Sequence, residues 1–170
     1  MEELNRPTIQ EFKEMRKNSL VIVLDNVRSM HNVGAVFRTA DGFAVEKMVL
    51  CGITGQPPHR EIEKTALGAT ESIDWVHESD VMRAVEALKA EGFKICAVEQ
   101  ANHSVPLDQF QPDSNEKYAL IFGNEVHGVT DSVMKIIDHC LEIPQFGTKH
   151  SFNISVTAGI LMWDFYCKMR

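Results

Sequence analysis

The sequence has few cysteines and no long hydrophobic run. A membrane-spanning helix needs about 18 or more consecutive apolar residues, and no segment approaches that length. The four cysteines lie far apart and form no CxxC pair, which argues against a disulfide framework or a zinc site. The N-terminal segment, MEELNRPTIQEFKEMRK, is polar and contains acids, unlike a signal or transit peptide. We therefore expect a cytoplasmic protein with reduced thiols and no metal.

Positive charge is also scarce. The chain has 17 lysines and arginines against 24 acidic residues, which gives a net charge of −7 and a pI near 5.5. This balance is unusual for a dedicated nucleic-acid binder, which normally has a basic footprint. The distribution of charge along the chain matters more than the net charge, because residues 26–40 and 143–163 contain no acid. A local positive surface on an acidic body is compatible with this pattern.

Several familiar site motifs are missing from the sequence. There is no GxGxxG after a strand and no GxxxxGK[ST], so dinucleotide binding of the Rossmann type and P-loop phosphate binding have no support. HExxH and GxSxG are absent as well, which removes the support for a zinc protease or an α/β-hydrolase. The GxxG at 52–55 lacks the surroundings of an RNA-clamping KH loop and predicts an ordinary turn.

What is present is the composition of one globular domain. The 170 residues are 44% hydrophobic and 24% charged, enough for a continuous core. No repeat, low-complexity tract or linker divides the chain. We expect a single domain over residues 1–170, in which residues 1–18 form a short N-terminal extension.

Apolar strand-like runs alternate with amphipathic helical segments along the chain. Strands are expected at 19–25, 47–51, 73–77, 94–98, 118–122 and 140–143, and helices at 8–17, 33–41, 59–67, 80–90, 131–138 and 153–168. This alternation predicts an α/β fold, with a parallel sheet and helices on both faces. Ligands of such sheets bind beyond the carboxyl ends of the strands. The candidate site loops are therefore 25–34, 98–103, 123–128 and 144–151.

The last expected helix, residues 153–168, is apolar around most of its circumference. One stripe consists of Ile154, Ala158, Leu161 and Phe165, and a second consists of Val156, Ile160 and Trp163. A helix that is apolar on most sides is normally buried. We interpret the second stripe as a contact with another subunit. The alternative is a wide core face within the monomer.

Three segments resemble a known family. NVGAVFRTA, IFGNEVHGV and IPQFGTKHSFNISVTAGI, in that order, are similar to the three motifs of the SpoU/TrmH family of RNA ribose methyltransferases. The resemblance implies a deep trefoil knot in the C-terminal part, an exception to the rule that chains avoid knots. It also implies methyl transfer from S-adenosylmethionine to a ribose 2′-hydroxyl, and a homodimer. The knot loops holding the cofactor would be 123–128 and 144–153.

The resemblance assigns roles to individual residues. Arg38 is implied as the central catalytic residue, with Asn32, Glu125 and Asn153 orienting it and binding ribose or cofactor. A guanidinium with a pKa above ~12 rarely acts as a base, so binding a phosphate and polarising the hydroxyl is the easier role. The implied cofactor-binding residues are Gly123, Ile143 and Phe152, and Ser151 matches a hydroxyl that could serve either the cofactor or the RNA. Val98, which closes the fourth expected strand, is expected to line the same cofactor-binding pocket.

Structural interpretations of the same residues remain open. Asn32 can cap the helix that follows it. Arg38, which lies in an apolar helix and looks buried, can form a structural ion pair with Glu125. Ser151 and Asn153 can cap the last helix, and Gly123 can serve a turn.

The RNA substrate is open too. The short N-terminal extension favours tRNA, contacted through residues 13–17 or 57–64, over rRNA. A non-catalytic module that binds RNA or cofactor is the alternative from a different functional class.

Overall fold

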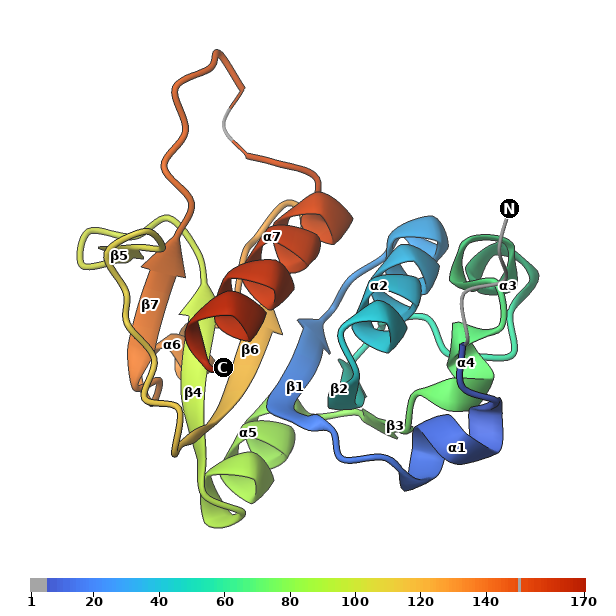
Figure 1. Ribbon diagram of the computed structural model, residues 1–170. Helices are drawn as coiled ribbons and strands as arrows, with labels where there is room; N and C mark the ends of the chain where they lie inside the picture. Colours follow the sequence, from blue (N-terminus) through green and yellow to red (C-terminus); the bar gives the residue numbers. More distant parts are fainter. Residues whose placement is uncertain (1–5, 150) are drawn as a thin grey trace.

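The computed structural model describes residues 6–149 and 151–170, and within them seven strands form one parallel sheet (Figure 1). The strands are β1 (Asn18–Asp25), β2 (Val45–Cys51), β3 (Trp75–Glu78), β4 (Phe93–Val98), β5 (Val105–Pro106), β6 (Lys117–Phe122) and β7 (His139–Glu142). Their order across the sheet is β3-β2-β1-β6-β4-β7-β5, and every neighbouring pair is parallel. The predicted α/β class is confirmed.

Helices cover both faces of this sheet (Figure 1). They are α1 (Ile9–Glu14), α2 (Met30–Gly42), α3 (Arg60–Ala66), α4 (Ala69–Ser72), α5 (Val81–Ala90), α6 (Asp131–Met134) and α7 (Ile154–Lys168). On one face α2 and α7 lie side by side, and on the other α5 and α6 pack against the strands. Among the described residues, no helix is both long and apolar enough to cross a membrane.

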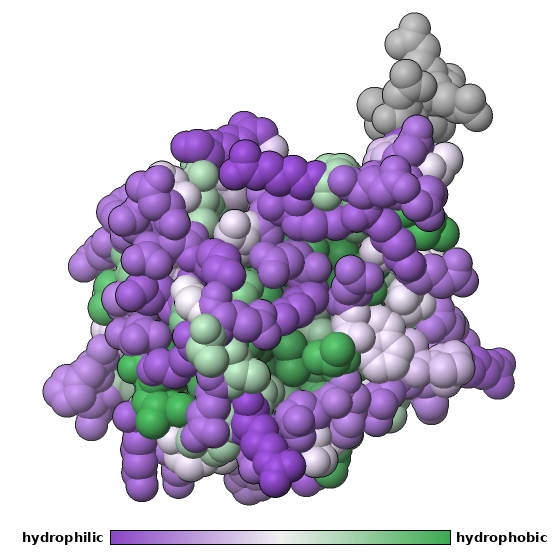
Figure 2. All heavy atoms as spheres, turned by 90° about the horizontal axis from the view of Figure 1, so that it is seen from below, coloured by the Kyte–Doolittle hydropathy of each residue, from purple (hydrophilic) through white to green (hydrophobic). Residues whose placement is uncertain are grey.

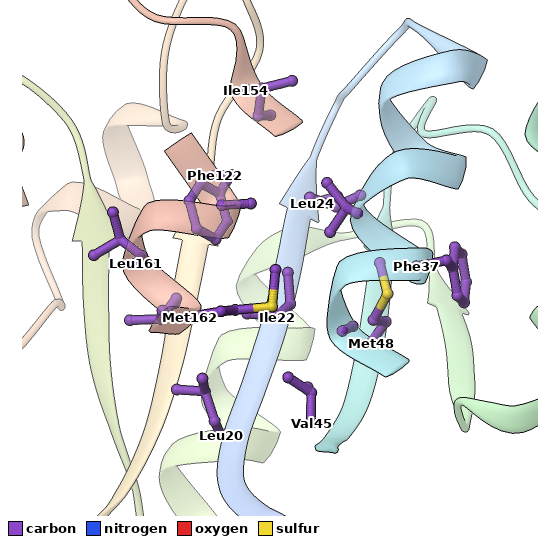
Figure 3. Close-up of a cluster of buried hydrophobic side chains, with 14 of the residues drawn as sticks. Leu20, Ile22, Leu24, Phe37, Val45, Met48, Phe122, Ile154, Leu161 and Met162 are labelled. Carbon is purple, nitrogen blue, oxygen red and sulfur yellow. The ribbon is translucent and has the colours of Figure 1, made fainter. Parts of the chain in front are cut away.

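Strand β1 separates two hydrophobic cores. Ile22 and Leu24 point into the core under α2 and α7, whereas Val21 and Val23 point into the core under α5. Figure 3 shows the first of these cores, where side chains of β1, β2 and β6 meet those of α2 and α7. A strand buried on both faces reads as a continuous apolar run, which is why SLVIVLD was recognisable as a central strand.

The sequence suggests Asn32 as the N-cap of α2 and Ser79 as the N-cap of α5, and the structure differs at both helices. The N-cap of α2 is Ser29, whose Oγ accepts a hydrogen bond from the Asn32 backbone N–H at 3.3 Å. The helix therefore begins one turn earlier than predicted, and the interpretation of Asn32 as its cap is wrong. In α5 the cap is Asp80, which accepts from the Met82 N–H.

Helix α6 is shorter than predicted, ending at Met134 instead of residue 138. Backbone bonds to β4 explain its early end, because the Asp138 N–H donates to the Ile95 carbonyl at 2.8 Å and the Asp138 carboxylate accepts from the Ile95 N–H at 2.7 Å. The two-residue strand β5 and the single-turn helix α4 were not predicted, since neither is long enough to show a period.

The two stripes of α7 have different environments. Ile154, Ala158, Leu161 and Phe165 are buried against the sheet and α2. Val156 and Trp163 on the second stripe are 51% and 57% exposed. The alternative of a wide core face within the monomer is therefore wrong, and the second-subunit contact stays a prediction.

The end of the molecule at which the strands begin has a mainly polar surface. Viewed from below, on the side where β1, β4 and β6 begin, the surface is mostly hydrophilic with scattered small apolar patches (Figure 2). An excess of acidic residues in the chain is consistent with this appearance. In parallel α/β sheets ligands bind at the other end, beyond the carboxyl ends of the strands.

Candidate functional site

A cavity of about 530 Å³ opens beyond the carboxyl ends of β4, β6 and β7. Eight of the nine predicted site residues line it: Asn32, Val98, Gly123, Glu125, Ile143, Ser151, Phe152 and Asn153. The first and the last of these residues, Asn32 and Asn153, are 121 positions apart in the sequence. Arg38 is the predicted residue that does not line the cavity.

The loop after β6 forms one wall and is held in a compact shape. Asn124 and Gly128 exchange two backbone hydrogen bonds of 3.0 and 2.8 Å. The buried Asn124 side chain accepts from the Val126 and His127 N–H groups and donates to the Asn26 carbonyl. This network gives the loop its shape without any ligand.

Two glycines in this loop are required by close approach. A Cβ on Gly123 would lie 2.0 Å from the backbone carbon of Gly128. Gly128 has φ +70°, a conformation that side chains disfavour, and a Cβ there would lie 2.1 Å from Glu99 Oε2. Gly123 does not have a positive φ, so the interpretation of it as a turn glycine is wrong. The close approach of Gly128 requires it instead, and this glycine brings bare backbone to the cavity wall.

Two carboxylates fasten the end of this loop to neighbouring strands. Asp25, at the end of β1 and only 1% exposed, accepts from the Thr130 N–H at 2.9 Å. Glu99, just after β4, accepts from the Val129 N–H at 3.2 Å and also lines the cavity. Sequence reasoning missed both acids. Their position directly after buried strands was the available signal.

Asn32 and Asn153 join the two halves of the site. The Asn153 Nδ2 donates to the Asn32 Oδ1 at 3.1 Å, although the residues are 121 positions apart. Asn153 also caps α7, because its Oδ1 accepts from the Ser155 N–H at 2.9 Å. The structural and functional interpretations of Asn153 are therefore compatible, and the cap holds the side chain at the edge of the cavity. Ser151 lines the cavity but does not cap α7.

Arg38 lies on an exposed part of α2, so the expectation of a buried arginine is wrong. The buried face of the helix carries Val33, Val36, Phe37 and Ala40. Successive side chains are rotated by about 100° about the helix axis, which places Arg38 outside this face. Glu125 is exposed at the rim of the cavity. Within the described residues no ion pair joins Arg38 to Glu125, so the structural ion-pair interpretation is not supported.

The cysteines near the site are poor nucleophiles. Burial, with help from Asp25, raises the pKa of Cys51 to about 12. Burial likewise raises the pKa of the Cys96 and Cys140 thiols on β4 and β7. Because a thiol attacks as the thiolate, these side chains are inert at neutral pH. In the part of the chain that the structure describes, no cluster of histidine, cysteine and acidic side chains could hold a metal ion.

The chemistry available in the cavity is therefore that of binding and orientation. Val98, Ile143 and Phe152 offer apolar surface to a flat ring, and Gly123 offers backbone at close range. Asn32 and Asn153 supply amide groups for hydroxyls, and such a mixture of apolar walls with a few convergent polar groups is typical of small-molecule sites.

Comparisons with known proteins point to one family. The model of the SpoU rRNA Methylase family matches residues 19–163. The 23S rRNA (guanosine-2'-O-)-methyltransferase RlmB of Neisseria meningitidis is 29% identical over 151 residues, covering 89% of this chain and 59% of that protein. The first curated relatives are matched over 40 to 63% of their own length.

Solved structures agree in fold. The TrmH/SpoU tRNA modifying enzyme of A. aeolicus superposes with a TM-score of 0.83 at 26% identity, covering 94% of this chain and 80% of that one. An AdoMet-bound rRNA methyltransferase from Sinorhizobium meliloti superposes with a TM-score of 0.80 at 24% identity, covering 90% and 58%.

Proposed function

Since the chain belongs to the SpoU rRNA methylase family, we propose that it transfers a methyl group from S-adenosylmethionine to a ribose 2′-hydroxyl of RNA, with tRNA as the favoured substrate. The observation that carries this proposal is the cavity itself. Its wall combines residues of all three sequence motifs around a space of about 530 Å³, within the size range of small-molecule sites.

The residues of the cavity fit the proposed cofactor. Val98, Ile143 and Phe152 suit the faces of adenine, and the backbone at Gly123 suits its edge. Ser151 supplies a hydroxyl, and the carboxylate of Glu125 supplies a negative charge for a cationic cofactor. When bound, S-adenosylmethionine provides a methyl group on a positively charged sulfur, and the cavity walls fix its direction for in-line attack.

The RNA side of the reaction rests on Arg38, Asn32 and Asn153. A guanidinium stays protonated at neutral pH, so the role of Arg38 is to bind a phosphate and stabilise negative charge on the 2′-oxygen. Its exposure on α2, outside the cavity, suits contact with a large polyanion. Asn32 lies on the same helix as Arg38 and lines the cofactor cavity together with Asn153, so the amide groups of this pair are available for the ribose.

A homodimer, the trefoil knot and a cytoplasmic location belong to the same proposal. The exposed stripe of α7 continues into an aromatic cluster that consists of Phe43, Trp163 and Tyr166. The centroids of these three rings are 5.8 to 6.1 Å apart. An apolar surface of this kind favours a second copy of the chain as its cover. The knot rests on the family resemblance alone, and the location rests on the scattered cysteines, which are typical of reduced thiols.

Two alternatives are kept. Ribosomal RNA is favoured by the curated relative from Neisseria meningitidis, whose name specifies 23S rRNA. A non-catalytic module that binds RNA or cofactor would use the same cavity without turnover.

The decisive experiment uses the full chain with methyl-labelled S-adenosylmethionine and separate tRNA and rRNA fractions from cells that lack the gene. We expect label in alkali-resistant dinucleotides of one fraction, and loss of that label with Arg38→Ala. Label in a base would contradict ribose methylation. Cofactor binding with no label in either fraction would identify a binding module, and full activity of Arg38→Ala would remove Arg38 from the mechanism.

A further inference from the structure

Phe146 is the most exposed of the large apolar side chains that the structure describes, with 96% of its surface accessible. It lies in the segment between β7 and α7, which projects beyond the rest of the molecule (Figure 1). A single exposed apolar side chain is common on protein surfaces and needs no special explanation. Its surroundings make Phe146 different.

The first of these surroundings is electrostatic. Residues 143–163 contain no acid, although the whole chain has a net charge of −7. Lys149 is exposed three positions after Phe146. A polyanion approaching an acidic protein is repelled by most of its surface and least by an acid-free segment. The segment that carries Phe146 therefore presents no negative charge of its own to a nucleic acid, although Glu99, Glu125 and Glu142 line the neighbouring cavity.

The second is position. Gln145, the residue before Phe146, lines the cavity, and so does Ile143. Successive Cα atoms are about 3.8 Å apart, so the phenyl ring is attached next to the mouth of the proposed active site. The residue that carries this ring is therefore joined directly to the wall of the proposed active site.

The third is accessibility. A Cβ added to Gly147 would have nothing within 4 Å, and none of the hydrogen bonds among described residues involves 144–149. The ring of Phe146 is thus accessible on its faces and can adapt to a ligand. An aromatic side chain with open faces is the kind of surface on which an unstacked base is held.

We propose that Phe146 stacks against a base of the substrate RNA beside the methylated nucleotide, while Lys149 contacts the adjoining phosphate. This inference rests on the proposed function. Where the substrate RNA presents an unpaired base at this point, the phenyl ring supplies a stacking partner for it. The ring makes no hydrogen bond to the base, so it contributes affinity and register with little sequence selectivity.

Two other occupants fit the ring less well. If Phe146 covered the cofactor, it would be expected along the cavity, yet it does not line it, whereas Gln145 and Phe152 do. If it bound a second copy of the chain, its apolar surface would be expected to join others, yet its described neighbours in sequence are Gln145, Gly147, Thr148 and Lys149. The apolar stripe of α7 is the better surface for that contact.

The test compares Phe146→Ala, Phe146→Leu and Phe146→Tyr. Tyrosine keeps the ring, while leucine keeps an apolar surface without it. Val76→Ala is the matched control, because Val76 is exposed on β3 at the far edge of the sheet. Methyl transfer is measured with the RNA fraction that the wild-type protein modifies, varying RNA and S-adenosylmethionine separately.

We expect Phe146→Ala and Phe146→Leu to raise KM for RNA about 10-fold, the loss of one stacking contact. Phe146→Tyr and Val76→Ala should stay within about 2-fold of the wild type, and KM for S-adenosylmethionine should be unchanged in all four variants. Lys149→Ala should lower the slope of log affinity against log salt by about 0.7, as expected for one phosphate contact on a single strand.

Three results would overturn the inference. The first is a changed KM of Phe146→Ala for S-adenosylmethionine, which would mean that the ring contacts the cofactor. The second is a changed molecular mass of Phe146→Ala in sedimentation, which would mean that the ring contacts a second copy of the chain. The third is an unchanged KM of Phe146→Ala for RNA. Filter binding of the same RNA with S-adenosylhomocysteine present measures RNA affinity without turnover. If the wild-type protein methylates no RNA fraction, the proposed function fails, and filter binding by the four variants still decides whether Phe146 contacts RNA.

Discussion

The two loops beside the cavity are built in opposite ways. The loop after β6 is bound to itself through Asn124 and Gly128 and to neighbouring strands through Asp25 and Glu99. The segment 144–149 has an exposed tip, and no hydrogen bond among the described residues holds it. A loop that holds its shape before binding avoids the entropy cost of ordering, while an unrestrained segment incurs that cost when its ligand arrives. The difference suits a small rigid cofactor on one side and a large variable RNA on the other.

Adding a methyl group to a glycine in each loop gives the largest contrast. In Gly123→Ala the new Cβ would lie 2.0 Å from the backbone of Gly128, so the loop must distort. We expect the affinity for S-adenosylmethionine to fall about 100-fold, measured by calorimetry. Gly147→Ala is the control, since its Cβ meets open space, and its cofactor affinity should match the wild type. Equal losses in both variants would mean that the two loops do not differ in rigidity.

Removing an anchor of the rigid loop comes next. Asp25→Ala leaves the Thr130 N–H without its buried acceptor. We expect the free energy of unfolding to fall by about 2 kcal/mol, measured by urea denaturation. Asp25→Asn retains an oxygen acceptor and should lose less. If Asp25→Ala unfolds at the wild-type urea concentration, the carboxylate does not anchor the loop.

The Asn32–Asn153 pair allows the cap to be separated from the site. Asn153→Ala removes the cap of α7 and the contact to Asn32, and should cost about 1 kcal/mol of stability together with most of the methyl transfer. Asn32→Ala removes the contact and leaves the cap, so its melting temperature should change little while turnover falls. Wild-type turnover in Asn32→Ala would show that the pair is only structural.

The smallest effect is expected in the exposed segment. Phe146→Ala and Thr148→Ala should each change the free energy of unfolding by less than about 0.5 kcal/mol, because both side chains are exposed. Urea denaturation beside Asp25→Ala provides the comparison. A loss above 1 kcal/mol in either variant would mean that the segment packs against the body in solution.

The strands show how far a local pattern reaches. Residues of β1, β2, β4 and β6 were predicted from apolar runs because both faces of these strands are buried, which leaves a strong signal. The α2 start was missed because Ser29 and Asn32 are both acceptable N-cap residues, and only the backbone path selects between them. The end of α6 was missed because Asp138 bonds to β4, a partner 43 residues away.

The candidate site divides in the same manner. Most of the predicted lining residues belong to the three motifs, and among them Asn153 caps α7 as one of its interpretations anticipated. The anchors Asp25 and Glu99 were missed, because their partners at Thr130 and Val129 lie 105 and 30 residues further along the chain. Arg38 was expected to be buried, although the apolar positions Val33, Val36, Phe37 and Ala40 mark the buried face of α2 and leave Arg38 outside it.

By itself, the sequence determined the α/β alternation, the central strands and the identity of the groups that surround the cavity. The alternation and the strands depend on composition and on periods of two or 3.6 residues, which are local properties. The groups around the cavity were identified through the resemblance of three motifs to a known family. Only the tertiary structure decided which acids anchor the cavity wall, which stripe of α7 stays exposed, and that Arg38 lies outside the cavity. Those outcomes depend on contacts between distant segments, and such contacts form only when the sheet brings the ends of β1, β4, β6 and β7 to one edge.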